Sequence, residues 1–226
     1  MKIAILGGTG DQGLGLAIRF IQANQEVIIG SRSIEKAQKA VAEIENYIGK
    51  EEAKNIQAMT NEDAAAAGDI LVLTVPLTAQ IATLKSIKEF VNGKIVIDAT
   101  VPLCSTIGGS PTECVDVWEG SAAERAAKVL KGSGAKILAA FNNISSASLL
   151  DFKNDVGCDC LIAGDDEESK KIAIDIINKF PGVAAIDCGP LSKARYIEKI
   201  TPLLIGLNIK YKTHYGGIKI VGLDRK

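Results

Sequence analysis

Short apolar runs alternate with longer stretches of helical periodicity along most of the chain. The apolar runs are Lys2–Leu6, Glu26–Ile29, Ile70–Val75, Lys94–Ile97 and Lys136–Ala140. Near-continuous Ile, Val, Leu and Ala are typical of strands buried on both faces of a parallel sheet. Helical patterns lie between and after them, at Gly13–Ala23, Ile34–Ile48, Glu62–Ala67, Ile81–Phe90 and Ala122–Leu130. Strands that alternate with helices predict βαβ units and an α/β fold with a doubly wound parallel sheet.

The C-terminal part of the chain continues this alternation. We expect a strand at Cys158–Ala163, a helix at about 167–179, a strand at Val183–Cys188 and a helix at about 193–209, followed by the apolar segment Ile218–Leu223. No composition change marks a linker. The pattern predicts a nucleotide-binding domain over residues 1–145 and a small α+β C-terminal domain, or annex, over 146–226. Ser121 and Glu124 form a capping-box pattern at a helix start, with Gly132 just past its end.

Composition and charge narrow the class of protein. The 226 residues are 47% hydrophobic and carry a formal net charge of -1, so the basic excess of a nucleic-acid binder is missing. No run approaches the ~18 apolar residues of a membrane span. The apolar run at the start, Ile3–Leu6, is too short for a signal peptide. We therefore expect a cytoplasmic protein with neither a nucleic-acid nor a membrane partner.

Cysteine and histidine usage argues against thiol or metal chemistry. The 5 Cys are an odd number with irregular spacing, which fits a reducing compartment and excludes pairing of all of them. Cys158 and Cys160 would face the same side of a strand that leads into an apolar run, which favours a structural role. His214 is the single histidine and lies in a tail rich in Lys and Tyr. We therefore expect neither a metal site nor a Ser-His-Asp or Cys-His mechanism.

A glycine motif directly follows the first strand and opens the first helix. Gly8–Gly13 reads G-x-G-x-x-G, the dinucleotide-binding fingerprint of a Rossmann-type sheet in its required context. Gly8 would permit the tight turn, Gly10 the approach of a pyrophosphate, and Gly13 close packing of helix on strand. Free amides and the positive end of the helix dipole would meet the phosphates. A glycine turn that serves packing alone is the alternative.

The end of the second strand distinguishes NADP from NAD. NAD-binding proteins usually carry Asp or Glu there to bind the ribose 2′-hydroxyl, whereas this strand ends Gly30-Ser31-Arg32. Arg32 and Lys36 lie at the N-terminal end of the next helix, where cations oppose the helix dipole. A bound 2′-phosphate held by Arg32, Lys36 and Ser31 would explain this arrangement. The alternative is a solvated pair of surface cations.

Two further loops follow core strands and end in proline. Leu73–Pro76 and Asp98–Pro102 should lie at the carboxyl ends of the strands, where ligands bind in open α/β sheets. Thr74 and Val75 are therefore candidates for the nicotinamide side. Near these loops the sequence offers no obvious acid–base group of the kind that alcohol dehydrogenation needs. A redox partner that accepts a bare hydride, such as a flavin-like ring, would need none.

Motifs spread over nearly the whole chain resemble the reduced coenzyme F-420:NADP oxidoreductases of methanogenic archaea. They include Gly7–Gly13, Ile29–Arg32, Leu73–Leu77, Asp98–Pro102, Gly120–Arg125, Ala140–Ile144, Asp187–Leu191 and Glu198–Leu204. The resemblance implies reversible hydride transfer between NADP and coenzyme F-420 (F420), a 5-deazaflavin. It implies no catalytic acid or base, because the reaction rests on holding donor and acceptor carbons at roughly 3–3.5 Å.

The resemblance also implies which residues bind the two partners. NADP would be bound by Thr9, Gly10, Asp11, Gln12, Ser31, Arg32, Lys36, Thr74, Val75, Val101 and Ser146, and the deazaflavin by Asn142, Thr201, Pro202 and Leu203. Some relatives carry His at the position of Asn142, so we expect Asn142 to position the ring by hydrogen bonding rather than by titration. Lys193, Arg195, Lys210 and Lys212 could border the pocket for the acidic tail of F420, although a solvated helix face explains them equally well.

The resemblance further implies a homodimer. Ile218–Leu223 is a candidate contact, with an ordinary edge strand of the annex as the alternative. Two other functions remain open on the residues alone. One is an NADPH-dependent imine or ketone reductase, which would need a proton donor in its pocket. The other is a non-enzymatic NADP sensor, which would need no ring-shaped apolar pocket.

Overall fold

A computed structural model describes residues 1–223 of the chain, and within them the helices and strands alternate as expected. The strands are β1 Lys2–Leu6, β2 Glu26–Ser31, β3 Ile56–Thr60, β4 Ile70–Leu73, β5 Ile95–Asp98, β6 Lys136–Ala139, β7 Asp159–Gly164 and β8 Ala184–Asp187. The α-helices are α1 Asp11–Gln22, α2 Ile34–Ile48, α3 Asn61–Ala67, α4 Leu77–Ile87, α5 Ala122–Val129, α6 Ser146–Leu150, α7 Glu167–Ile177 and α8 Ala194–Tyr211. Short 3-10 helices occupy Lys88–Phe90, Cys104–Ile107 and Leu191–Lys193.

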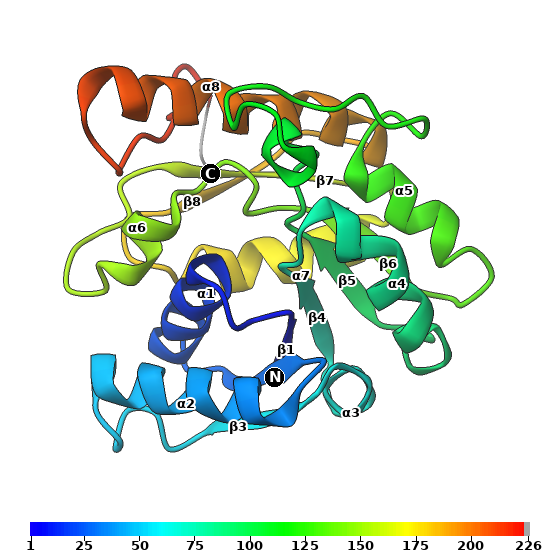
Figure 1. The fold of residues 1–226 in the computed structure, drawn as a ribbon, viewed down its shortest axis with the longest axis vertical. Helices are drawn as coiled ribbons and strands as arrows, with labels where there is room; N and C mark the ends of the chain where they lie inside the picture. Colours follow the sequence, from blue (N-terminus) through cyan, green and yellow to red (C-terminus); the bar gives the residue numbers. More distant parts are fainter. Residues whose placement is uncertain (224–226) are drawn as a thin grey trace.

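The strands form one sheet in the order β3-β2-β1-β4-β5-β6-β7-β8 (Figure 1). Neighbouring strands are parallel except for β6 and β7, which run antiparallel. The order reverses at β1, because β2 and β4 pair on its two sides. Such a switch point leaves a crevice at the carboxyl ends of the strands. The doubly wound α/β fold is thereby confirmed. The annex strands β7 and β8 extend the same sheet across residue 145.

Apolar side chains on both faces of the sheet explain the continuous hydrophobic runs. In β1, Ile3 and Ile5 pack into a core cluster shared with α1, α2, α6 and α7. Ala4 and Leu6 pack on the other face, into a cluster shared with α3, α4 and α5. A third, smaller cluster lies between β7, α5 and α8. Alternate side chains of a strand point to opposite faces, so burial on both faces requires apolar residues at every position.

A buried arginine joins the first helix to the chain after residue 145. Arg19 of α1 is fully buried, and its guanidinium donates to the carbonyl oxygens of Ser148, Leu149, Asp151 and Asn154 at 2.8–3.0 Å. Burial lowers its pKa. An Arg can be buried at this cost because its planar fork of donors satisfies several acceptors at once.

Of the β-strands and α-helices, two were not predicted from the sequence, and a third was predicted to begin too late in the chain. The edge strand β3 has a single neighbour, so its mixed sequence shows no continuous apolar run. Helix α6 has 5 residues, too few to reveal a helical period. Helix α4 begins at Leu77 rather than at Ile81, because Pro76 occupies its N-cap, where a missing N–H costs nothing. By contrast, the predicted N-cap of α5 is confirmed: Ser121 Oγ accepts from the amide of Glu124 at 3.0 Å and donates to its carboxylate at 2.8 Å.

The C-terminal segment is irregular rather than an edge strand. The main-chain oxygen of Ile218 accepts a hydrogen bond from the amide of Asp159 at 2.8 Å. Ile218 and Ile220 pack against the cluster between β7 and α8. Residues 218–223 thus lie beside β7 without forming a strand, and the edge-strand alternative is wrong. Among residues 1–223, no helix combines the length and apolarity that a membrane crossing requires.

Candidate active site

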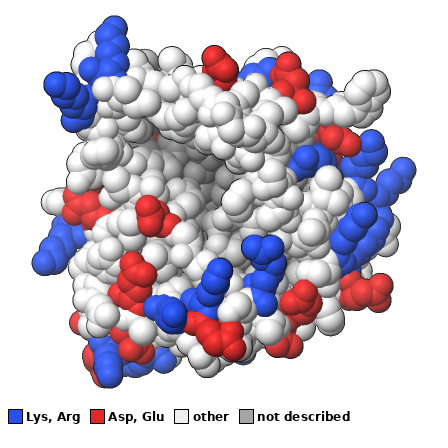
Figure 2. Space-filling model, viewed as in Figure 1, with Lys and Arg blue, Asp and Glu red and all other residues white. Residues whose placement is uncertain are grey.

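A cavity of about 790 Å³ lies at the carboxyl ends of β4, β5 and β6 and is covered by α8. Figure 2 shows the molecule hollowed near its centre, with mainly uncharged side chains around the hollow. The lining residues of the sheet side are Gln12, Thr74, Val75, Pro76, Ala99, Thr100, Val101, Leu103, Thr106 and the turn Phe141–Ala147. The lining residues of the α8 side are Thr201, Leu204, Ile205, Asn208, Ile209, Lys212, Thr213, His214 and Gly216. Ligand pockets typically have about this size and this apolar character.

In the glycine turn beside the cavity, the individual glycines have different roles from those predicted. Gly7, rather than Gly8, has the left-handed backbone, with φ of +71°. A Cβ on Gly7 would lie 2.3 Å from Cγ1 of Val75, and one on Gly13 would lie 2.5 Å from the Cα of Gly8. Gly7 is therefore the turn residue, and Gly8 and Gly13 pack against each other. At Gly10 no atom lies within 4 Å of the position that a Cβ would occupy, so there is open space at the N-terminus of α1.

The predicted 2′-phosphate residues lie together at the junction of β2 and α2. Ser31 is buried and its hydroxyl accepts from the amide of Ser33 at 3.3 Å. Ser33 is the N-cap of α2, accepting from the amide of Lys36. Arg32 and Lys36 are exposed. Within residues 1–223 the structure gives their side chains no ion pair or hydrogen bond, so both cations are available to an anion.

Asn142 lines the cavity and carries a side-chain oxygen without a partner among the described residues. Its side chain is 5% exposed, and its Nδ2 donates to the main-chain oxygen of Thr100 at 3.0 Å, with that of Asp98 at 3.5 Å. Of the two ends of the side-chain amide, only the NH₂ group can donate to a carbonyl oxygen. These contacts therefore identify the oxygen as the end that remains without a partner. Asn142 Oδ1 is buried and has no partner among the described residues. A buried acceptor without a donor is costly, and an N–H group of a bound ring would satisfy it.

A buried polar network holds the loop that carries Thr100. The Asp98 carboxylate accepts from the amide of Thr100 at 2.8 Å and from the side-chain NH₂ of Gln80. Burial raises the pKa of Asp98 to about 6. Gln80 also donates to the carbonyl oxygen of Ala122 at 2.9 Å and accepts from Arg125 Nε at 2.6 Å. The network therefore ties the cavity wall after β5 to the first turn of α5.

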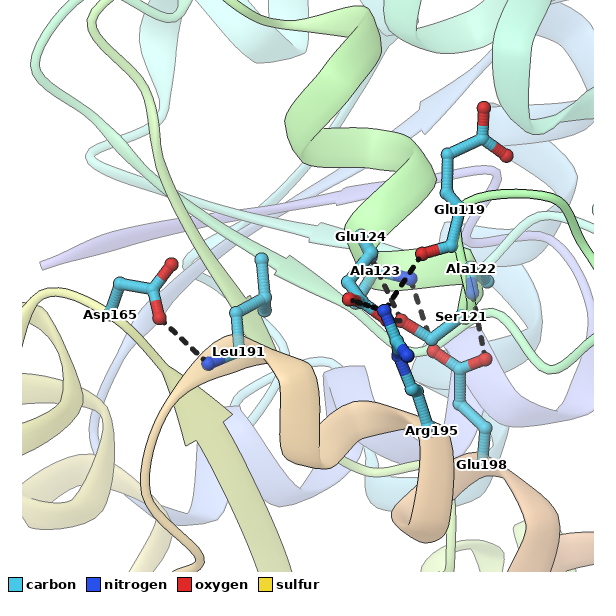
Figure 3. A network of polar contacts seen from close by, with 9 residues as sticks. All are labelled: Glu119, Ser121, Ala122, Ala123, Glu124, Asp165, Leu191, Arg195 and Glu198. Carbon is cyan, nitrogen blue, oxygen red and sulfur yellow. Dashed lines mark hydrogen bonds and ion pairs between the residues drawn. The ribbon is translucent and has the colours of Figure 1, made fainter.

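Helix α8 is attached to the same turn of α5 by a buried carboxylate (Figure 3). Glu198 is 1% exposed and accepts from the amides of Ala122 and Ala123 at 2.8 and 3.0 Å. Burial outweighs these hydrogen bonds and raises the pKa of Glu198 to about 8. At the surface, Arg195 donates to both carboxylate oxygens of Glu124, at 2.7 and 2.8 Å. These contacts fix the helix that forms one wall of the cavity.

The α8 wall differs from the sequence-based expectation for the deazaflavin pocket. Thr201 lies in the lining as expected, but Pro202 and Leu203 do not. Pro202 is buried away from the cavity, and Leu203 is 61% exposed on the outer face of the helix. Positions 201, 204, 205 and 208 share one face of a helix with 3.6 residues per turn. The inward face of α8 is therefore formed by Leu204, Ile205 and Asn208 together with Thr201.

Lys212, one of four cations considered for the border of the pocket, and His214, which the sequence separated from the site, both lie in the cavity wall. Lys212 and His214 follow α8 and line the cavity. Ser145 Oγ donates to the main-chain oxygen of His214 at 2.5 Å, so this contact does not involve the imidazole. No sequence signal indicated that the chain turns back to the cavity after α8. The single histidine is therefore closer to the site than its position in the sequence suggested.

The cysteines lie away from the cavity lining. Burial raises the pKa of the Cys158 thiol to about 11 and that of the Cys160 thiol to about 12. Both pack in the same core cluster, as the predicted strand face required. Within residues 1–223, no group of three or more His, Cys, Asp or Glu side chains could hold a metal ion.

Comparison with known proteins places this chain in a family. The family model described as "NADP oxidoreductase coenzyme F420-dependent" matches residues 2–102. The F420-dependent NADP reductase of Methanothermobacter thermautotrophicus is 53% identical over 226 residues, covering 100% of this chain and 97% of the relative. That of Methanocaldococcus jannaschii is 48% identical over 225 residues, covering 99% and 100%. A solved structure from Arthrobacter sp. FB24 shares the fold, with a TM-score of 0.83 at 24% identity over 98% of this chain and 100% of the other.

Proposed function

This chain belongs to the family of F420-dependent NADP reductases, and from that membership we propose that its cavity transfers a hydride reversibly between reduced F420 and NADP. The observation that carries the proposal is the coincidence of full-length similarity with one apolar cavity beside an open glycine turn. The protein's contribution is to hold two flat rings face to face and to exclude water from between them.

The nucleotide end of the site is supported by open space and free cations. NADP would lie across the carboxyl ends of β1 and β4, with its pyrophosphate at Gly10 and the N-terminus of α1. Arg32, Lys36 and Ser31 would hold the 2′-phosphate. The remaining nucleotide contacts that we propose are Thr9, Asp11, Gln12, Thr74, Val75, Val101 and Ser146, of which the last five line the cavity.

The deazaflavin end is supported by the unsatisfied amide oxygen and the inward face of α8. Asn142 would accept a hydrogen bond from an N–H group of the bound ring, because its own NH₂ is already held by main-chain oxygens. Thr201 would hold the turn that carries Asn142, and Leu204 and Ile205 would form the apolar floor. This face replaces Pro202 and Leu203 of the sequence-based assignment.

The assay that tests the function mixes the purified protein with NADPH and oxidised F420 and follows the loss of the deazaflavin's visible absorbance. We expect rapid loss with NADPH and little with NADH. Turnover of imines or ketones in place of F420 would favour the reductase alternative, for which His214 and Lys212 would be candidate proton donors. Binding of NADP without turnover of any substrate would favour the sensor.

The outer face of α8 supports a homodimer through an apolar stripe. Tyr196, Leu203, Leu207 and Tyr211 share this face, and their exposed fractions lie between 39% and 68%. Exposed apolar patches of this kind mark interaction sites, and a second copy of the chain is the partner we propose. The segment 218–223 is a further candidate contact, since Val221 is 88% exposed. Light scattering should give a dimer for the unaltered protein and a monomer for Leu203→Glu/Leu207→Glu.

A further inference from the structure

The charge of the cavity is confined to one end. Among the described lining residues there is no Asp or Glu, and Lys212 is the single residue with a permanent charge. His214, two positions further on, lines the same end. Such an asymmetric wall favours a ligand with an uncharged body and an anionic extension.

The turn that carries these two residues is held in place by hydrogen bonds. The amide of Thr213 donates to the main-chain oxygen of Asn208 at 3.0 Å, and the amide of Gly216 donates to Asn208 Oδ1 at 2.9 Å. Ser145 Oγ anchors His214 from the opposite wall. Lys212 itself adopts a left-handed backbone with φ of +52°, which is uncommon for a residue with a side chain. The turn is therefore ordered before any ligand binds, which lowers the entropic cost of binding.

Lys212 is also the unengaged cation of its helix. Arg195 is paired with Glu124 (Figure 3), and Lys199 is paired with Asp116 at 3.3 Å. Lys193 and Lys210 lie over the rings of Tyr196 and Tyr211. Within residues 1–223 the side chain of Lys212 has no such partner. Figure 2 shows Lys and Arg side chains gathered at the upper left, over the C-terminal end of α8.

From these observations we propose that Lys212 and His214 form a subsite that binds a phosphate or carboxylate group on the arm of the substrate whose ring fills the apolar cavity. The proposal rests on the proposed function. Lys212 supplies the charge and His214 a hydrogen-bond donor. The nucleotide phosphates are assigned above to Gly10 and Arg32, and neither residue lines this cavity. The anion therefore belongs to the deazaflavin arm.

The test compares two deazaflavins, F420 and the neutral deazaflavin that ends at the ribityl chain and lacks the phosphate and glutamates. Deazaflavin fluorescence gives the Kd of each without turnover, at low and at high salt. We expect Lys212→Ala to raise the Kd of F420 at low salt by roughly tenfold, through a lost charge-assisted hydrogen bond, and to flatten its salt dependence. The Kd of the neutral deazaflavin should not change.

Two further variants serve as controls. Lys210→Ala removes a cation that lies outside the lining and should leave both Kd values unchanged, and Lys212→Arg should restore most of the affinity for F420. An equal loss for both deazaflavins, a higher Kd for NADPH in Lys212→Ala, or no change at all would each overturn the subsite. If the unaltered protein binds and reduces neither deazaflavin, the proposed function itself fails.

Discussion

The hydroxyl of Thr201 donates a hydrogen bond of 2.7 Å to the main-chain oxygen of Asn142. This contact joins the inward face of α8 to the turn after β6, two parts of the chain that are far apart in sequence. It orients Asn142, a residue of the cavity lining whose side-chain oxygen has no partner among the described residues. The position of the C-terminal helix and the presentation of that oxygen are therefore coupled.

Replacing the Thr201 hydroxyl should weaken this coupling. We expect Thr201→Val to lower kcat/KM for F420 by about threefold to tenfold, the effect of one lost hydrogen bond worth ~0.5–1.5 kcal/mol. Thr201→Ser keeps the hydroxyl and serves as the matched control. Steady-state kinetics with NADPH held saturating would measure the effect. An unchanged kcat/KM in Thr201→Val would show that the hydroxyl does not support the deazaflavin site.

Removing the Asn142 amide should affect the deazaflavin more than the nucleotide. We expect Asn142→Ala to lower F420 turnover by roughly tenfold, because the acceptor for a ring N–H group is lost, while the Kd for NADP changes little. Turnover and NADP binding by calorimetry, measured on the same preparation, make the comparison. A loss confined to NADP affinity would place Asn142 in the nucleotide site.

The exposed cation after β2 should select the phosphorylated nucleotide. Arg32→Ala should weaken NADP binding by ~1.5–3 kcal/mol through a lost charge-assisted contact, and should leave NAD binding nearly unchanged. Titration calorimetry with both nucleotides would show the difference. Lys39→Ala, an exposed cation further along α2, is the control and should behave like the unaltered protein. An equal loss for NADP and NAD in Arg32→Ala would contradict the 2′-phosphate assignment.

The open space at Gly10 separates binding from folding. Gly10→Val introduces a side chain where no atom lies within 4 Å of the Cβ position, so the protein should fold with its Tm nearly unchanged. NADP binding should nevertheless be lost, because the side chain would occupy the path of the pyrophosphate. Gly7→Ala should show the opposite pattern, a lower Tm, since the backbone is left-handed and the new Cβ would collide with Val75. Thermal unfolding and NADP titration of both variants would test this prediction. An unchanged NADP affinity in a folded Gly10→Val protein would show that the pyrophosphate does not bind at Gly10.

The buried carboxylate of Glu198 should make stability depend on pH. Burial raises its pKa from 4.5 to about 8, so the folded chain holds this proton more tightly than the unfolded chain. The contribution to the free energy of unfolding is then complete below about pH 4.5 and is lost as the pH rises toward about 8. In the unaltered protein the free energy of unfolding should fall by on the order of 4 kcal/mol between those pH limits, and Glu198→Gln should abolish this fall.

Urea unfolding at a series of pH values from about 5 to about 8 would measure how the free energy of unfolding depends on pH. Glu43→Gln, which changes an exposed carboxylate on α2, should leave the slope as it is in the unaltered protein. Identical slopes in Glu198→Gln and the unaltered protein would show that Glu198 stays ionised, held by its two backbone amides.

The sequence predicted the sheet well because its strands are buried on both faces. The run Lys2–Leu6 and the glycine motif after it describe a local βαβ unit, and such a unit leaves its mark on consecutive residues. The edge strand β3 and the short helix α6 left none, since half-exposed or five-residue elements impose no clear period. Hydrophobic patterns therefore predicted the elements correctly where burial on both faces requires apolar residues at every position.

The candidate site was predictable only in part because its walls come from distant segments. Thr74 and Val101 follow core strands, so the rule that ligands bind at the carboxyl ends of strands located them, whereas Asn142 was assigned by resemblance. Lys212 and His214 reach the cavity through a turn held by Asn208 and Ser145, contacts that no local pattern encodes. Leu203, which the resemblance assigned to the deazaflavin, lies outside the cavity lining, because motif similarity does not say which face of a helix points inward.

The contacts of the Arg19 guanidinium bear on whether residues 1–145 can fold without the annex. Its four carbonyl acceptors all lie beyond residue 145, on and just after α6. A fragment ending at residue 145 would lose every one of these acceptors, together with the apolar side chains of Leu149 and Val156 that complete the core cluster beside α1. The first helix would thus lack its complement, and the nucleotide-binding part and the annex are expected to fold as one cooperative unit rather than as separable modules.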